Sequence, residues 1–255
     1  MSKFPASGLV QLRRHIEKLE GSRSDAGALS FGVAAIDARL RGGGLTLGAV
    51  HEITGDGDGA VDGAAAALFA AGIAARTDGP VLWCATEPDL FAPGLARAGL
   101  DPRRLIHVEA GDERTLLACC EEGLRHGGLG AVIGDVSRLS MTASRRLQLA
   151  AEDSGTLALV VRRWRNIRDA AEFGGPTAAV TRWRIASLPS APLPVPGIGR
   201  ARWRLELLRC KGGNPAEFHV EACDGTACLA LSAALADRPA ATADSREPKV
   251  WRSAS

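Results

Sequence analysis

Short apolar runs alternate with helical patterns through the middle of this chain. The apolar runs predict buried strands at Ala49–Ile53, Val81–Ala85, Leu105–Val108, Ala131–Gly134 and Leu157–Val161. Segments with helical character lie between them, at Leu90–Ala98, Glu113–Arg125 and Thr142–Glu152. Apolar strands that alternate with helices are typical of a parallel sheet covered by helices on both faces. The pattern therefore predicts an α/β protein.

The pattern changes in the last third of the chain. Residues such as Arg202–Leu207 alternate between polar and apolar, which is the period of a strand with one wet face. The predicted strands are Thr181–Leu188, Ala201–Cys210 and Glu217–Cys223, and a proline-rich loop, Pro189–Gly197, joins the first two. We expect these strands to form an antiparallel edge of the sheet at its C-terminal end.

Two terminal segments differ from the core at residues 27–235. In residues 1–26, a helix with one apolar face is predicted, and a polar linker follows it. The apolar positions are Leu9, Leu12, Ile16 and Leu19. Such a helix can dock on its own core or on a partner, and the residues leave both open. Residues 236–255 are polar and are predicted to form a disordered tail, with Trp251 as its apolar residue.

The composition sets limits on the function. A chain of 255 residues that is 46% hydrophobic can bury one sizeable core, and a net charge of +2 indicates no particular partner. The longest uncharged apolar run, Gly63–Ala75, is too short for a bilayer, so we expect a cytoplasmic protein without membrane contact. The six cysteines include no C-x-x-C spacing, which favours reduced thiols and no metal site.

The turn between the first strand and an alanine-rich helix has the glycine pattern of a phosphate-binding loop, G-x-x-x-x-G-K-[ST]. Gly55 takes the first glycine position, and Gly57 and Gly59 follow within the turn. Ala60, Val61 and Asp62 then stand where glycine, lysine and serine or threonine are expected.

These replacements predict a large loss of phosphate affinity. A lost charge-assisted contact costs roughly 1.5 to 3 kcal/mol, and a carboxylate near a phosphate adds repulsion of up to about 4 kcal/mol. Together they correspond to on the order of a thousandfold in affinity. Asp62 could instead help to hold a metal, so weak ATP–Mg binding stays open although no cofactor is expected. The alternative is a glycine-rich turn that binds nothing.

Two further features bear on chemistry. Asp135 ends a predicted buried strand, which suits a Walker B carboxylate, although the same position also suits a helix cap. Arginines beside an indole can bind single-stranded DNA, because the charges contact the backbone and the ring stacks on a base. The alternatives are that the segment is a solvated face or contacts another protein. That basic segment contains Arg162, Arg163, Trp164, Arg165 and Arg168.

The segment from Gly27 to Leu231 resembles the core of RecA-type recombinases. Glu87 matches the family's water-activating glutamate, and Asp135 matches its Walker B position. The range Arg162–Gly174 matches the second DNA-binding loop, and Arg209-Cys210-Lys211 resembles the basic triplet that reaches a neighbouring subunit's ATP.

The chain departs from that pattern at the loop positions Ala60, Val61 and Asp62. With these departures it resembles the ImuA family, which are RecA-like accessory proteins of a bacterial damage-inducible mutagenesis cassette. The resemblance implies a non-catalytic adaptor with a vestigial Glu87. Its implied partners are the polymerase-like ImuB and, through ImuB, an error-prone C-family DNA polymerase, with RecA and single-stranded DNA as further contacts. An active RecA-type ATPase and a cell-division inhibitor remain the alternative hypotheses.

Overall fold

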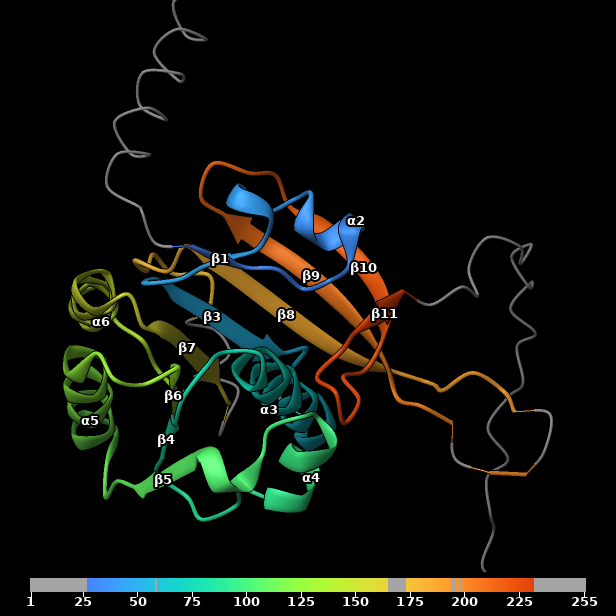
Figure 1. The fold of residues 1–255 in the computed structure, drawn as a ribbon, viewed down its shortest axis with the longest axis horizontal. Helices are drawn as coiled ribbons and strands as arrows, with labels where there is room; N and C mark the ends of the chain where they lie inside the picture. The colour runs from blue at the N-terminus through green and yellow to red at the C-terminus, as the bar shows by residue number, and fades with distance from the viewer. Residues whose placement is uncertain (1–26, 58, 165–172, 194–195, 198, 232–255) are drawn as a thin grey trace, which may run out of the picture.

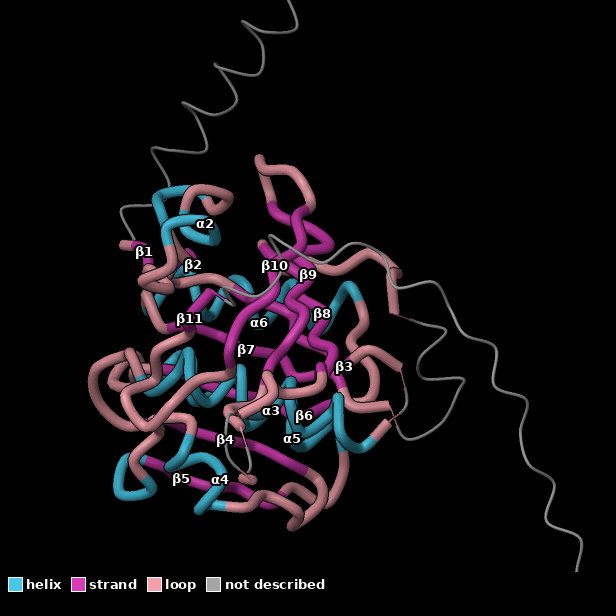
Figure 2. Tube along the Cα trace, turned by 90° about the vertical axis from the view of Figure 1, so that its right-hand side faces the viewer, coloured by secondary structure: helices cyan, strands magenta, loops and turns pink. Residues whose placement is uncertain are grey.

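A nine-stranded sheet forms the centre of the molecule (Figure 1). The computed structural model describes residues 27–57, 59–164, 173–193, 196–197 and 199–231. The strand order is β11-β10-β9-β8-β3-β7-β6-β4-β5. In the view turned by 90°, β10, β9, β8, β7, β4 and β5 follow one another from top to bottom in that order (Figure 2).

One half of the sheet is parallel, as the alternation of strands and helices predicts. Its strands are β3 (Val50–Gly55), β4 (Val81–Ala85), β5 (Leu105–Glu109), β6 (Ala131–Val136) and β7 (Leu157–Arg162). β3 lies between β7 and β8, and all neighbouring pairs from β8 to β5 are parallel. β3, β4, β6 and β7 are buried along their whole length, which explains why they read as apolar runs without alternation.

The other half is antiparallel, and it confirms the predicted C-terminal edge. Its strands are β8 (Thr181–Leu188), β9 (Arg202–Cys210), β10 (Ala216–Glu221) and β11 (Ala230–Leu231). β8 joins the two halves because it runs parallel to β3 and antiparallel to β9. The burial of β9 alternates residue by residue, as its sequence predicts.

Helices cover both faces of the parallel half. α3 (Ala60–Ala75) and α4 (Ala92–Arg97) pack over one face, and α5 (Glu113–His126) and α6 (Met141–Ser154) pack over the other (Figure 1). α3 is rich in alanine and glycine, so its backbone approaches its neighbours closely: a Cβ on Gly72 would lie 2.3 Å from the Sγ of Cys223. The fold class expected from the sequence is therefore confirmed.

Local signals set the ends of the longer helices. Asp112 and Ser140 cap the N-termini of α5 and α6, where their side chains accept hydrogen bonds from the backbone N–H groups of Thr115 and Ala143. Both helices end at a glycine in the left-handed conformation. Because Ser140 is the cap of α6, Asp135 does not serve as a helix cap.

A small N-terminal unit leads into the sheet. It contains β1 (Ala28–Leu29), the short α2 (Ala34–Asp37), the 3-10 turn η1 (Arg41–Gly43) and β2 (Leu45–Thr46), which pairs antiparallel with β1. A second 3-10 turn, η2 (Pro102–Arg104), lies between α4 and β5. Phe31 reaches from the N-terminal unit to Phe69 of α3 and Trp183 of β8, with ring centroids 5.8 and 5.6 Å away. The unit thereby joins the core on the α3 side.

Some expectations concern residues outside the described ranges. The predicted N-terminal helix with Leu9, Leu12, Ile16 and Leu19 lies there, and so do the tail at 236–255 and the positions Arg165 and Arg168. No helix among the described residues has the length and apolar character needed to cross a membrane.

Candidate functional site

A cavity of about 550 Å³ lies at the carboxyl ends of the parallel strands. The glycine-rich turn after β3 and the first turns of α3 form one wall. The segment after β4, with Glu87 and Asp89, and the ends of β6 and β7, with Asp135 and Arg163, form the rest. This is the place where open α/β sheets bind their ligands.

The glycine-rich turn keeps the close approach of a phosphate-binding loop. A Cβ on Gly55 would lie 2.7 Å from the carbonyl carbon of Asp62, so only glycine allows β3 and α3 to come this near. Gly57 has φ of 95°, a left-handed conformation that side chains disfavour. The N–H of Asp56 donates to the carbonyl of Ile185 at 2.9 Å, which anchors the turn on β8.

The residues at the lysine and serine positions of the loop point elsewhere. Val61 is 68% exposed and does not line the cavity. Asp62 does not line the cavity either, because its Oδ1 accepts a hydrogen bond from the N–H of Ser187 at 2.7 Å. The carboxylate of Asp62 thus connects α3 to β8, and a role of Asp62 in holding a metal stays a prediction.

Arg163 brings together two carboxylates in the cavity. Its guanidinium nitrogens lie 2.7 Å from both carboxylate oxygens of Asp89 and 2.5 Å from Oδ2 of Asp135. Its backbone N–H donates to the carbonyl of Val136 at 3.0 Å. Burial lowers the pKa of Arg163, but the hydrogen bonds that Arg163 donates to Asp89 and Asp135 outweigh burial and hold that pKa above its ordinary value. The side chain stays charged.

Magnesium-bound ATP does not fit this set of residues. In the RecA-type arrangement a Walker B carboxylate faces Mg²⁺ beside a lysine that contacts phosphate. Here the guanidinium of Arg163 lies against Asp135, and the described residues that line the cavity include no lysine. Glu87 also lines the cavity.

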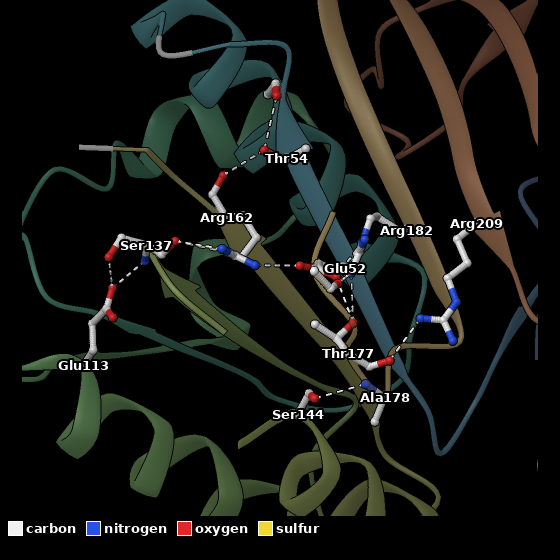
Figure 3. Close-up of polar contacts among 12 residues, drawn as sticks. Glu52, Thr54, Glu113, Ser137, Ser144, Arg162, Thr177, Ala178, Arg182 and Arg209 are labelled. Atoms are coloured by element: carbon white, nitrogen blue, oxygen red, sulfur yellow. Dashed lines mark hydrogen bonds and ion pairs between the residues drawn. The ribbon is translucent and has the colours of Figure 1, made fainter. Parts of the chain in front are cut away.

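Arg162, the residue next to Arg163, is buried in a network of three charges (Figure 3). Glu52 of β3 accepts from Nη1 of Arg162 at 2.7 Å and from Nε of Arg182 at 2.8 Å. Arg162 also donates to the carbonyl of Ser137, and Thr177 donates to Glu52. Arg162 is 2% exposed, so the expected contact with DNA or a partner is wrong for this residue.

Trp164 packs on other side chains of the same region. Its ring lies edge-on to that of Phe173, with centroids 5.1 Å apart, and the guanidinium of Arg162 lies 5.3 Å from the Trp164 centroid. Arg182 lies 5.1 Å from the centroid of Phe173. In this structure the indole of Trp164 is thus in contact with protein groups, and its stacking on a base stays a prediction.

The basic pair Arg209 and Lys211 lies away from the cavity. Arg209 pairs across β8 and β9 with Arg182, whereas Leu205 pairs with Ile185 beside the glycine-rich turn. The triplet therefore sits toward the amino ends of the parallel strands. Arg209 donates to the carbonyl of Thr177 at 3.0 Å (Figure 3). A contact of these residues with a neighbouring subunit stays a prediction.

Several functional residues escaped the reading of the sequence. Glu52 and Arg182 are charged residues buried within strands, and Asp89 accepts two of the three guanidinium contacts described for Arg163. A charged residue within an apolar strand is the signal that could have pointed to Glu52, since buried charges need a partner. Its partner Arg182 could not be predicted from the sequence, because β3 and β8 are far apart in the chain.

Other titratable groups form no second site. All six cysteines are free thiols. Among the residues that the structure describes, no three His, Cys, Asp or Glu side chains gather as metal ligands would.

The sheet order and the cavity at its carboxyl ends define a RecA-like core. The crystal structure of the RadB recombinase matches it with a TM-score of 0.53 at 16% sequence identity, over 76% of this chain and 95% of that chain. This likeness concerns the fold alone.

The chain belongs to the ImuA family. It is 39% identical over 242 residues to Protein ImuA of Caulobacter vibrioides, in strain NA1000 / CB15N and in strain ATCC 19089 / CIP 103742 / CB 15. The match covers 88% of this chain and 96% of each relative. No protein-family model matches the chain.

Proposed function

We propose that this protein is a non-catalytic RecA-like adaptor in SOS-induced, mutagenic translesion DNA synthesis. Its membership in the ImuA family supports an accessory role of this kind. In this proposal the protein works in the cytoplasm and connects the polymerase-like ImuB with an error-prone C-family DNA polymerase. RecA and single-stranded DNA are further proposed contacts.

One observation carries the non-catalytic part of the proposal. The two residues at the lysine and serine positions of the phosphate-binding loop, Val61 and Asp62, face away from the cavity. A RecA-type ATPase needs a lysine at the first position to contact the outer phosphates and a hydroxyl at the second to hold Mg²⁺. An adaptor needs only a stable core that presents surfaces.

ATP turnover by the purified full chain, with single-stranded DNA and Mg²⁺, tests this part. We expect the rate of the wild type to equal that of Glu87→Gln, because Glu87 has no activated phosphate to act on. Turnover that disappears in Glu87→Gln would contradict the proposal.

The adaptor role has its own test in cells. A strain that lacks the chain is complemented with the wild type or with Glu87→Gln, and mutation frequency is counted after DNA damage. We expect both to restore damage-induced mutation equally. A Glu87→Gln protein that accumulates normally and fails to restore it would point to catalysis.

Partner binding is tested by affinity purification of the tagged chain after DNA damage, read by mass spectrometry. We expect a polymerase-like protein to be enriched over an undamaged control. Recovery of the division GTPase in its place, with arrest of cell division on overexpression, would favour the inhibitor hypothesis.

An ATPase of the recombinase class is the second candidate. The observation in its favour is that Glu87 and Asp135 line one cavity of about 550 Å³ at the carboxyl ends of the strands. The same turnover assay separates the two candidates, since only the ATPase loses activity in Glu87→Gln.

A further inference from the structure

Three acidic side chains line the cavity, and one arginine pairs with two of them. Glu87, Asp89 and Asp135 all line the cavity, and the Arg163 guanidinium contacts Asp89 and Asp135. Carboxylate oxygens are the ligands that divalent cations prefer. An acidic cavity of this composition would attract a metal ion if the arginine were absent.

We propose that the Arg163 guanidinium is the resident cation of this cavity and that it occupies, between Asp89 and Asp135, the place a divalent cation would need. The cavity is then one that divalent metals do not enter. This proposal deepens the proposed function, because it names the side chain that excludes metal from the site.

The geometry around Arg163 holds the guanidinium in place. Asp89 is contacted through both of its oxygens by two different nitrogens, which is the two-pronged pairing that arginine makes and lysine cannot. The Arg163 backbone is anchored on β6 by its hydrogen bond to Val136. Both ends of the side chain are therefore fixed.

The path of the side chain also depends on a small neighbour. The Cδ of Arg163 lies 3.8 Å from the point that a Cβ on Gly63 would occupy. The arginine stem thus passes over the first turns of α3, next to the position where the family places its magnesium-binding hydroxyl. The positive charge at the site therefore belongs to Arg163, a residue of the chain itself that follows the end of β7.

The charge balance of the site agrees with this arrangement. The side chain of Asp135 is 7% exposed, and a carboxylate that is so deeply buried needs a nearby positive charge. Arg163 provides that charge at 2.5 Å. A second cation in the same space would face the guanidinium at contact distance, where repulsion between like charges is strong.

Binding of Tb³⁺ to the full chain tests the proposal. Trp164 lines the same cavity, so excitation of tryptophan reports Tb³⁺ bound there through sensitised emission. We expect little emission from the wild type. In Arg163→Met, which keeps an unbranched apolar stem and removes the charge, we expect Tb³⁺ to bind at least about tenfold tighter. Excess Mg²⁺ should displace it.

Matched variants locate the effect. Arg163→Lys keeps a positive charge and should remain close to the wild type. The double variant Arg163→Met with Asp135→Asn should lose the new emission. Arg103→Gln removes another arginine that pairs with a carboxylate, that of Asp101, on the exposed surface, and it should not create a cavity site.

Two results would overturn the proposal. One is Tb³⁺ emission from the wild type that disappears in Asp135→Asn. The other is an Arg163→Met protein that is folded by circular dichroism and binds Tb³⁺ no tighter than the wild type. If Arg163→Met does not fold, the comparison of the wild type with Asp135→Asn decides, and an absence of Asp135-dependent emission supports the proposal.

The outcome is separable from that of the proposed function. Metal binding by the wild type without ATP turnover would overturn this inference and leave the adaptor intact. ATP turnover that Glu87→Gln abolishes would overturn the adaptor whatever Tb³⁺ does.

Discussion

Two neighbouring arginines at the end of β7 serve different regions of the molecule. Arg162 points into the sheet and meets Glu52 and Arg182, whereas Arg163 points into the cavity and meets Asp89 and Asp135. The first is 2% exposed, and the side chain of the second is 28% exposed. Arg162 therefore has a structural role in the sheet, whereas the adjacent Arg163 belongs to the cavity.

The comparison shows that burial determines how much a charged side chain contributes to stability. In the Glu52 network all charged groups are out of water, so removing one leaves the others without compensation. In the cavity, Asp89 is half exposed, so water can replace much of what Arg163 supplies. We therefore expect stability to depend on Arg162 and ligand selectivity to depend on Arg163.

The largest expected effect is on the buried network. Glu52→Gln keeps the shape of the side chain but leaves Arg162 and Arg182 as buried charges with no carboxylate between them. We expect the free energy of unfolding to fall by about 3 to 5 kcal/mol, measured by urea denaturation. Glu217→Gln, at an exposed pair with His219, is the control and should change it by less than about 0.5 kcal/mol.

A second substitution set makes this prediction stricter. Replacing Glu52, Arg162 and Arg182 together by apolar residues of similar size should recover most of the loss, because no unpaired charge remains. Equal destabilisation of the single and the triple variant would mean that packing, and not charge, holds these strands together.

The next effect concerns pH and the other face of β3. His51 is fully buried: its Nε2 donates to the carbonyl of Thr46, and its Nδ1 accepts from the hydroxyl of Thr181, which accepts from the indole of Trp183. Burial lowers the pKa of His51 to about 4, although the hydrogen bond to Thr46 raises it.

The sign of the pH effect follows from this lowered pKa. The unfolded chain takes up a proton near pH 6.5 and the folded chain only near pH 4, so stability is complete above 6.5 and falls as pH drops toward 4. Between pH 7 and pH 5 we expect a loss of about 2 kcal/mol by urea denaturation. His51→Gln should show a much flatter profile, and an unchanged profile would exclude His51 as the cause.

A smaller effect is expected at the cavity wall. Gly55→Ala places a Cβ 2.7 Å from the backbone of Asp62, so β3 and α3 must separate. We expect a loss of about 1 to 3 kcal/mol in thermal or urea unfolding. Gly59→Ala is the matched control, because its Cβ meets nothing within 4 Å and its φ is −72°. A Gly55→Ala protein as stable as the control would show that the turn adapts.

The smallest expected effect is the loss of stability in Arg163→Met. We expect about 1 to 2 kcal/mol, because water screens the half-exposed Asp89 whereas the buried Asp135 loses its counter-charge. Arg162→Met, measured in the same denaturation series, should cost about 3 kcal/mol or more. Equal losses for the two variants would break the distinction between the network and the cavity.

The sequence predicted most of the fold because its signals are local. Val81–Ala85 and Thr181–Leu188 are strands over the predicted residues, and the helices α5 and α6 extend only slightly beyond their predicted ends. Apolar runs and caps act within a few residues, so they can be read directly. The partners of β8 could not be read in this way: it was expected among antiparallel strands, yet it runs parallel to β3 on one side.

The site was less predictable for the same reason. The position of the cavity followed from the glycine-rich turn and Asp135, but the contacts of its charged residues did not. Arg162 and Arg163 look alike in the sequence, and which of them is buried depends on Glu52 of β3 and Asp89 after β4, which are far away in the chain. Only the pairing of strands fixes such neighbours.

The contact between Trp164 and Phe173 joins two parts of the chain that flank β7 and β8. Their ring centroids lie 5.1 Å apart, and each ring also lies against an arginine that is paired with Glu52. These contacts connect the end of β7 to the residues before β8 without passing through the positions between them. The register of the two strands beside β3 is therefore set by the side chains on either side of that stretch.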